Sequence, residues 1–430
     1  MKTLSKNLMA TAIATLFIAP AAFATNGTNM TGVGAEAVAL GGTGTAAFYG
    51  AESVIINPAL IGKGQGTEFA FGGTLFKPNV SNNGLGGSLM NSSQTTSEGD
   101  TYMIPAISLS SRINNNWSFG LGMYGTSGMG VDYGNQKDLM KAGLVQAQTS
   151  LQIMRIVPTV TYNTANAGIG FSPIIQYGAL DINYNMAVMG GGNVGSGMKS
   201  DLGMGFSLGG YYDFSKQFTL GATYTSAISM KYDGQLSTAS APFTMANGGP
   251  LASAFSDTLE QPAEVKLGAA YTMGNIMVTG DFKQIRWGDA KGYKDFGWED
   301  QNVIALGLKY SGKGYWVGAG FNKADNPIKK FSATPTGMTM QEQLAAGVGG
   351  TKNFFNNIFF PATTEQHFSV GGGYDITKNV TLEGAIMYAP EVSTTVDTTA
   401  LTQSMAPGAS STNTTKHSQM AYTIQAKYKF

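Results

Sequence analysis

The chain has no cysteine and only two histidines among its 430 residues. Without cysteine there are no disulfides and no thiolate ligands for a metal, so an exported fold must be stabilised by packing and backbone hydrogen bonds. His367 begins a predicted strand and His417 lies in a Ser/Thr-rich loop, and neither has a nucleophile beside it or a metal-ligand spacing. The sequence therefore predicts no catalytic residues, no metal site and no cofactor.

Charge is also scarce, since charged residues are 12% of the chain and 26 basic residues balance 26 acidic ones. The absence of a basic block argues against a nucleic-acid partner, because phosphates require a concentrated positive surface. After the N-terminal region, no uninterrupted apolar run reaches the roughly 18 residues that a membrane-spanning helix needs. These two absences exclude a nucleic-acid-binding protein and a helical membrane protein.

The N-terminus is typical of a secretory signal peptide. Lys2 and Lys6 precede an apolar run from Leu8 to Ala19, and the small-residue site Ala22-Phe23-Ala24 follows. We expect residues 1–24 to be removed, so that the mature chain begins at Thr25 and functions outside the cytoplasm.

The C-terminal segment from Met420 to Phe430 shows a strict two-residue alternation. One face carries apolar and aromatic side chains and the other carries Thr, Gln and Lys. Successive side chains of a strand point to opposite sides of a sheet, so one face suits lipid and the other suits water. This pattern is typical of a strand of a bacterial outer-membrane barrel.

Similar alternation predicts fourteen strands along the chain, at about 67–79, 101–112, 117–126, 150–163, 168–187, 203–213, 217–232, 263–273, 276–287, 301–311, 314–323, 366–375, 379–390 and 419–430. The connections alternate strictly between short turns and long loops. Outer-membrane barrels place all short turns on the periplasmic side and all long loops outside. A soluble β-propeller or sandwich would also contain many short strands, but gives no reason for this alternation. We therefore predict an all-β fold, a 14-stranded antiparallel transmembrane β-barrel over residues 67–430.

Residues 25–66 do not have the pattern of a strand and are rich in Gly and Ala. A barrel of about fourteen strands encloses more space than its wall side chains can fill. We expect this segment to be a compact hatch, or plug, in the lumen. Its glycines could also suggest a dinucleotide site, but no strand and no βαβ unit surrounds them.

The chain resembles the FadL/TodX (OmpP1) family of outer-membrane transporters. The likeness is carried in order along the mature chain by Gly32-Val33-Gly34, Gly44, Asn57-Pro58-Ala59-Leu60, Asn116 to Gly122, Gln261-Pro262-Ala263, Arg286-Trp287, Asn326-Pro327-Ile328, Phe360-Pro361-Ala362 and His367 to Tyr374. The resemblance implies a 14-stranded barrel with an N-terminal hatch that passes long-chain fatty acids, aromatic hydrocarbons or similar apolar molecules. It also implies lateral release through a wall opening where the third strand is kinked.

Two motifs are candidates for that opening. Gly120, Gly122 and Gly125 on the third strand allow a bend or bulge, although crowding against the hatch would explain them as well. Asn57-Pro58-Ala59 fixes a bend in the hatch, either beside the opening or simply as a turn that holds the hatch in place.

The candidate ligand-binding residues are mostly apolar and lie in two long loops. They could form a capture site for greasy molecules, in which Met side chains adapt to several shapes, or they could pack on one another as a cap. These candidates are Met129, Leu139, Met140, Phe354, Phe355, Phe359 and Phe360.

A fatty acid would also need a basic partner for its carboxylate. By strand parity, Arg155 and Lys283 face inward, although ion pairing among wall residues would explain them too. Fatty-acid-binding members of the family carry a basic residue on the fifth strand, where this chain has Gln176, Tyr177 and Asp181. That difference favours neutral or aromatic substrates.

From these observations we predict a monomeric, non-enzymatic protein of the bacterial outer membrane. It would contact lipid and lipopolysaccharide and carry hydrophobic small molecules passively. The alternatives are a general porin, an adhesin or host-interaction barrel, and a barrel enzyme.

Overall fold

The computed structural model describes residues 25–84, 94–134, 146–185, 192–335, 339–403 and 408–430. The predicted signal peptide and the candidates Leu139 and Met140 lie outside these ranges.

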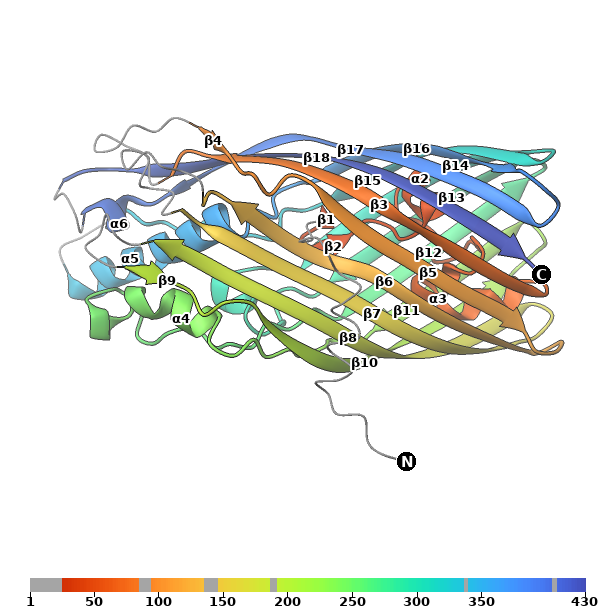
Figure 1. Cartoon of the computed structure of the whole chain (residues 1–430), viewed down its shortest axis with the longest axis horizontal. Helices are drawn as coiled ribbons and strands as arrows, with labels where there is room; N and C mark the ends of the chain where they lie inside the picture. Colours follow the sequence, from red (N-terminus) through yellow and green to blue (C-terminus); the bar gives the residue numbers. More distant parts are fainter. Residues whose placement is uncertain (1–24, 85–93, 135–145, 186–191, 336–338, 404–407) are drawn as a thin grey trace, which may run out of the picture.

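Fourteen long antiparallel strands of the described residues form a closed barrel (Figure 1). Each strand pairs with the next, and the last, β18, pairs with the first, β3, from Thr415 opposite Asn82 to Lys429 opposite Glu68. This closure removes the two free edge strands that an open sheet would expose to lipid. The strands are β3 (Thr67–Asn82), β5 (Tyr102–Arg112), β6 (Trp117–Asp132), β7 (Gln148–Asn163), β8 (Ala167–Asn185), β10 (Lys199–Asp213), β11 (Phe218–Thr225), β12 (Glu264–Met273), β13 (Ile276–Ile285), β14 (Gln301–Gly312), β15 (Tyr315–Ala324), β16 (Gln366–Asp375), β17 (Val380–Asp397) and β18 (Thr412–Lys429).

The predicted two-faced pattern is seen in the wall. On β14, Ile304, Leu306 and Leu308 point outward and are 52–54% exposed in the isolated chain. Between them, Gly307 faces inward, where a side chain would meet Leu40 Cβ at 2.8 Å. The outer face therefore suits lipid, while the inner face is shaped by what fills the lumen.

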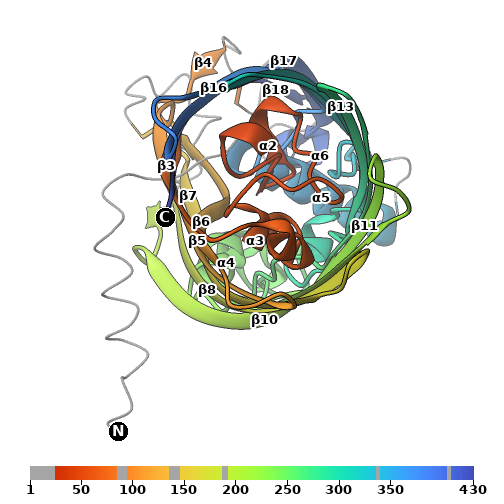
Figure 2. The same cartoon turned by 90° about the vertical axis from the view of Figure 1, so that its right-hand side faces the viewer.

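Residues 25–66 lie inside the ring of strands (Figure 2). They form β1 (Thr25–Asn26), β2 (Asn29–Met30), the helices α2 (Ala35–Ala39) and α3 (Ser53–Ile56), and the 3-10 helix η1 (Pro58–Lys63). Wall glycines let this backbone approach closely, since a Cβ at Gly320 would lie 2.1 Å from Gly41 N. We call residues 25–66 the N-terminal segment.

The long loops carry further short elements at the opposite end of the barrel from the short turns (Figure 1). They are β4 (Thr95–Thr96), β9 (Asn193–Val194), α4 (Leu236–Ser240), η4 (Ala241–Phe243), η5 (Met245–Asn247), η6 (Lys294–Phe296), α5 (Met340–Phe354), the π-helix η7 (Phe355–Phe359) and α6 (Thr399–Gln403). Within the described ranges, no helix has both the length and the apolar character that crossing a membrane demands.

Three strands are longer than predicted, since 117–126 continues to Asp132, 379–390 continues to Asp397, and 419–430 begins at Thr412. His417 therefore lies in β18 and not in a loop.

Another strand prediction was too long at its end. The expected strand 217–232 stops as β11 at Thr225, and Ile228, Met230 and Tyr232 are buried inside the barrel instead of facing lipid. The inward-facing Gly203 and Gly178 leave room for them, because an added side chain there would collide with Met230 and Tyr232. The apolar alternation continues past Thr225, so the sequence could not show that the chain turns into the lumen.

Candidate functional site

The ladder between β5 and β6 is interrupted. Pairing runs from Arg112 opposite Ser118 to Ala106 opposite Tyr124, whereas β6 continues beside β7 to Asp132. A register shift between Gly125 and Ser127 leaves Thr126 as a bulge residue. Bulges bend a strand and end its pairing. In the described part of β6, the segment from Gly125 to Asp132 therefore has no ladder partner on β5.

The N-terminal segment takes part of the place of β5 at this interruption. Asn29 pairs with Ser127, and Gly128 N donates a hydrogen bond to Thr28 O at 3.0 Å. Ser127 Oγ donates to the same carbonyl at 3.0 Å. The interruption ends at Asp132, the last residue of β6, where Glu98 N donates a hydrogen bond to Asp132 O at 2.8 Å. The result is a bounded gap in the β5–β6 pairing whose inner side contacts residues 28–29.

The three candidate glycines of β6 have different positions. Gly125 lies at the bulge, as the hypothesis of a wall opening requires. Gly120 and Gly122 lie in the paired part of the strand, and a side chain on Gly120 would meet Val54 of the N-terminal segment at 2.5 Å. Those two glycines therefore provide packing space.

Asn57-Pro58-Ala59 holds the N-terminal segment against the wall near the short turns. Asn57 Oδ1 accepts a hydrogen bond from Ala59 N at 3.1 Å, and its amide donates to Gly210 O on β10 at 3.1 Å. Pro58 O accepts from Thr161 on β7 at 2.6 Å. Thr161 pairs with Ser118, in the part of β6 that also pairs with β5, so the described contacts of this bend agree with a turn that holds the segment in place. That the bend lies beside an opening stays a prediction.

Arg155 and Lys283 line one small cavity of about 70 Å³ inside the barrel, together with Lys266 and Glu264. Arg155 Nε donates to Gln176 Oε1 at 2.9 Å, and Lys266 Nζ lies 3.5 Å from Glu264 Oε2. Lys283 is 7% exposed, and in the described part of the chain it makes no hydrogen bond or ion pair. Three cations thus meet Glu264 at this cation cavity, which also touches Thr126 of the bulge. The carboxylate of Asp281, two positions before Lys283 on β13, also interacts electrostatically with Lys266 and Lys283. Lys283 therefore has carboxylates near it but no direct ion pair.

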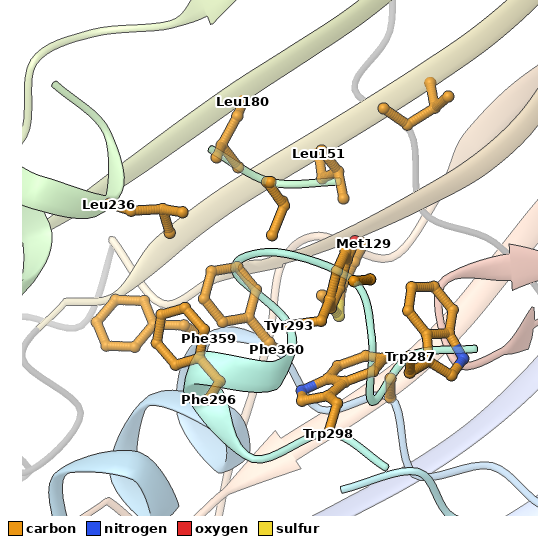
Figure 3. Packing of buried hydrophobic residues seen from close by; sticks show 14 of the residues in the cluster. Met129, Leu151, Leu180, Leu236, Trp287, Tyr293, Phe296, Trp298, Phe359 and Phe360 are labelled. Atoms are coloured by element: carbon orange, nitrogen blue, oxygen red, sulfur yellow. The ribbon is translucent and has the colours of Figure 1, made fainter. Parts of the chain in front are cut away.

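The candidate phenylalanines are not exposed. Phe354, Phe355, Phe359 and Phe360 are 0–5% exposed and belong to one hydrophobic cluster with Met129. The cluster also contains aromatic side chains of residues 286–300, a long loop that folds into the lumen. Figure 3 shows Trp287, Tyr293 and Trp298 grouped near Phe296 and Phe360. We call the set Trp287, Tyr293, Phe296, Trp298, Phe354, Phe355, Phe359 and Phe360 the aromatic core.

The aromatic core is also tied by hydrogen bonds. Trp298 Nε1 donates to Asn356 Oδ1 at 2.9 Å, and Thr28 contacts the hydroxyl of Tyr293 at 3.5 Å. Burial raises the pKa of Tyr293 to about 12, so this hydroxyl keeps its proton at neutral pH. Of these residues, the sequence predicted only the four phenylalanines as ligand-binding candidates. Trp287 contributed to the family resemblance, and Trp298 was visible only as one of four tryptophans.

A larger cavity of about 660 Å³ lies among the long loops. This outer cavity is lined by Pro242, Phe243, Asn247, Gly248, Gly249, Pro250, Pro335, Met340, Gln343, Leu344, Gly347, Phe354, Ala400, Leu401, Gln403 and Gly408. None of these lining residues is charged. The cavity therefore suits an apolar molecule, with a few amide groups available for hydrogen bonding. Of the ligand-binding candidates within the described ranges, Phe354 alone lines it.

A buried ion cluster joins the N-terminal segment to the wall, and sequence reasoning did not identify it as a unit. Lys427 Nζ of β18 lies 2.9 Å from Glu52 Oε1 and 3.0 Å from Glu383 Oε2. Lys309 of β14 hydrogen-bonds to Glu36 of α2. Lys309 and Lys427 lie on wall strands, and only the fold shows that their partners include Glu36 and Glu52 of the N-terminal segment.

A filled, closed barrel with an interrupted strand pairing and an apolar outer cavity defines a class of protein, the outer-membrane transport channel. The comparison with protein families agrees with this class. Residues 10–430 match the family described as outer membrane protein transport protein (OMPP1/FadL/TodX), and the chain belongs to this family. It is therefore a protein of the bacterial outer membrane and not an enzyme.

Solved structures of similar fold cover nearly the whole chain. The Pseudomonas putida toluene transporter TodX is 18% identical and superposes with a TM-score of 0.64, covering 94% of this chain and 100% of that one. A Pseudomonas aeruginosa FadL homologue is 14% identical with a TM-score of 0.69, covering 94% and 100%. The Ralstonia pickettii toluene transporter TbuX is 15% identical with a TM-score of 0.61, covering 93% and 99%. At these identities the likeness establishes the fold.

A curated relative from Chlorobium limicola, an uncharacterized protein encoded in the 5' region of the phosphoenolpyruvate carboxykinase gene, is 44% identical over 80 residues. The match covers 18% of this chain and spans 39% of the length of that relative.

Proposed function

We propose that the protein transports hydrophobic small molecules passively across the outer membrane and releases them sideways through the wall. The single observation that carries this proposal is the interrupted pairing between β5 and β6 beside residues 28–29 of the N-terminal segment. In this proposal the N-terminal segment acts as a hatch that blocks a straight aqueous path, so the gap beside Gly125 is the exit.

The outer cavity is the proposed capture site. Its uncharged lining offers apolar surface to a hydrocarbon or an acyl chain. Burying ten methylene groups stabilises a complex by roughly 8 kcal/mol before the costs of association are subtracted, which is enough for useful affinity. The two related toluene transporters support aromatic hydrocarbons as one substrate class.

The cation cavity supports a second class, hydrophobic molecules that carry a carboxylate. Arg155, Lys266 and Lys283 gather at this cavity, and Lys283 makes no direct ion pair among the described residues, although Glu264 and Asp281 interact with it electrostatically. A carboxylate head group would supply one, and the cavity adjoins the bulge at Thr126 through which the apolar tail would leave. A neutral hydrocarbon would pass without using this site.

The proposal is tested by uptake and by the content of the purified protein. A strain lacking the protein should lose uptake of radiolabelled toluene or dodecanoate, and a plasmid copy should restore it. Mass spectrometry of protein purified in mild detergent should find the corresponding molecule. A general porin would instead show a persistent ion conductance in planar bilayers. If the protein were an adhesin, cells that lack it would lose attachment, while their uptake of both labelled compounds would stay unchanged.

A further inference from the structure

Two phenylalanines belong both to the lining of the outer cavity and to the buried hydrophobic cluster. Phe243 of η4 and Phe354 at the end of α5 both line the cavity, and their ring centroids are 5.8 Å apart. They come from two different long loops, and Phe243 also packs on Phe355 with centroids 5.3 Å apart. Phe354 has no surface exposed to bulk solvent, so its ring contributes to the cavity wall and to the core below.

Behind these two rings the packing is continuous. Phe354 contacts Phe355 and Phe359, with ring centroids 5.9 and 5.8 Å away, and Phe355 stacks on Phe359 at 5.3 Å. The same hydrophobic cluster extends to Met129, in the part of β6 that pairs with β7 but not with β5. A molecule that moves from the outer cavity to the wall gap must therefore displace aromatic rings.

The backbone that carries these rings is held firmly. The chain leaves α5 as the π-helix η7, a rare geometry that occurs often at functional sites. Asn356 Nδ2 donates to Phe296 O at 2.8 Å, and Asn357 Nδ2 donates to Thr394 O and Asn413 O at 3.2 Å each. These amides fix η7 to a neighbouring loop and to the wall strands, so rotation of side chains is the less costly way to open a path.

We infer that Phe243 and Phe354 form a floor to the outer cavity and determine which molecules leave it, an inference that rests on the proposed function. Rotating one ring opens a passage about as wide as the ring itself. The floor therefore admits a flat single-ring compound or an unbranched alkyl chain and rejects a rigid compound that is wide in all three dimensions. Phe243 and Phe354 are specificity-determining residues.

The buried tryptophans provide the assay. Trp287 and Trp298 lie below the floor, with ring centroids 5.0 Å apart, and bromine quenches indole fluorescence on contact. Full-length protein in detergent is mixed rapidly with bromobenzene or with 1-bromoadamantane, which is bulky. Trp117 faces lipid and is replaced by W117F in every sample, so that quenching reports the interior.

We expect bromobenzene to quench the parent protein quickly and 1-bromoadamantane to quench it slowly. F354A should raise the rate for 1-bromoadamantane by roughly tenfold, the ratio that corresponds to about 1.4 kcal/mol, and change the rate for bromobenzene much less. F354L, which keeps more volume, should give an intermediate rate. The matched control is F368A, which removes a ring that faces lipid and is 48% exposed.

The inference is overturned if both probes quench the parent at one rate, or if F354A and F354L keep the parent ratio while migrating as folded barrels on unheated gels. Failure of the proposed function looks different: cells that contain folded parent protein would take up neither toluene nor dodecanoate.

Discussion

Lys427 Nζ lies 2.9 Å from Glu52 Oε1, and this ion pair joins the last strand of the barrel to the N-terminal segment. Lys427 Nζ also donates to Tyr49 O at 2.6 Å. Lys427, Glu52 and Tyr49 are all buried, so the ammonium of Lys427 is what compensates a negative charge on Glu52. Removing one partner of a buried pair leaves an uncompensated charge and typically costs about 3–5 kcal/mol.

We therefore expect K427M to loosen the N-terminal segment. Hydrogen exchange of residues 49–63 should become faster, and planar bilayers should show an ion conductance that the parent protein lacks. K429M is the matched control, because Lys429 is on the same strand, is 59% exposed and lies 3.8 Å from Glu68. Equal exchange and conductance in the two variants would show that Lys427 does not hold the segment.

The bulge of β6 can be removed by one deletion. Deleting Thr126 joins the register of Gly125 opposite Met154 to that of Ser127 opposite Ile153, so β6 can pair with β7 without a bulge and need not bend away from β5. We expect the deletion to reduce uptake to the level of cells without the protein, because the proposed exit would close. T126A keeps the bulge and should retain uptake. Full uptake by a folded deletion variant would rule out release at this position.

The ammonium of Lys283, which makes no direct ion pair among the described residues, is expected to separate the two substrate classes. A buried opposite charge is worth several kcal/mol at an effective dielectric of about 20, so K283M should reduce dodecanoate uptake by at least about tenfold. Toluene uptake should not change. K323M, at an exposed lysine of β15, is the control and should leave both rates unchanged. If K283M transports dodecanoate normally, the cation cavity has no role in recognition.

Asn57 and Asn326 make the same local turn in different places, which allows a paired test. Each side-chain oxygen accepts a hydrogen bond from the backbone N of the residue two positions later. Asn57 is fully buried and also binds Gly210 O of the wall. N57A should destabilise the N-terminal segment locally by about 1–2 kcal/mol and speed hydrogen exchange at residues 58–63. N326A should leave that exchange unchanged, and a similar effect of both variants would contradict an anchoring role for Asn57.

Thr25, the first residue that the structure describes, is hydrogen-bonded to the barrel, and this is relevant to where the signal peptide is cleaved. Thr25 N donates to Gln419 Oε1 at 3.2 Å, and Thr25 O accepts from Thr364 Oγ1 at 3.1 Å. Together with the Ala22-Phe23-Ala24 site, these contacts lead us to expect a mature chain that begins at Thr25. Intact-mass measurement of protein isolated from outer membranes checks this. A mass that includes residues of the 1–24 range would contradict it.

Local pattern was sufficient for most of the wall. The alternation of Ile304, Leu306 and Leu308 with inward residues identifies β14 at nearly its observed bounds, and the short turns between strand pairs have the predicted places. This succeeds because the period of two is imposed on every wall strand by lipid on one side and the lumen on the other. The strand prediction failed after Thr225, because the same alternation continues in a segment that is buried inside the barrel.

The amino-acid sequence by itself determined the compartment, the barrel and the family, because these depend on composition, periodicity and ordered motifs. Only the tertiary structure decided that Arg155 and Lys283 meet at one cavity, that Phe354 lines another, and that Asn57 and Pro58 contact β10 and β7. Such neighbours are brought together by barrel closure and by loops that fold inward. Those contacts join residues far apart in the chain, so no local pattern encodes them.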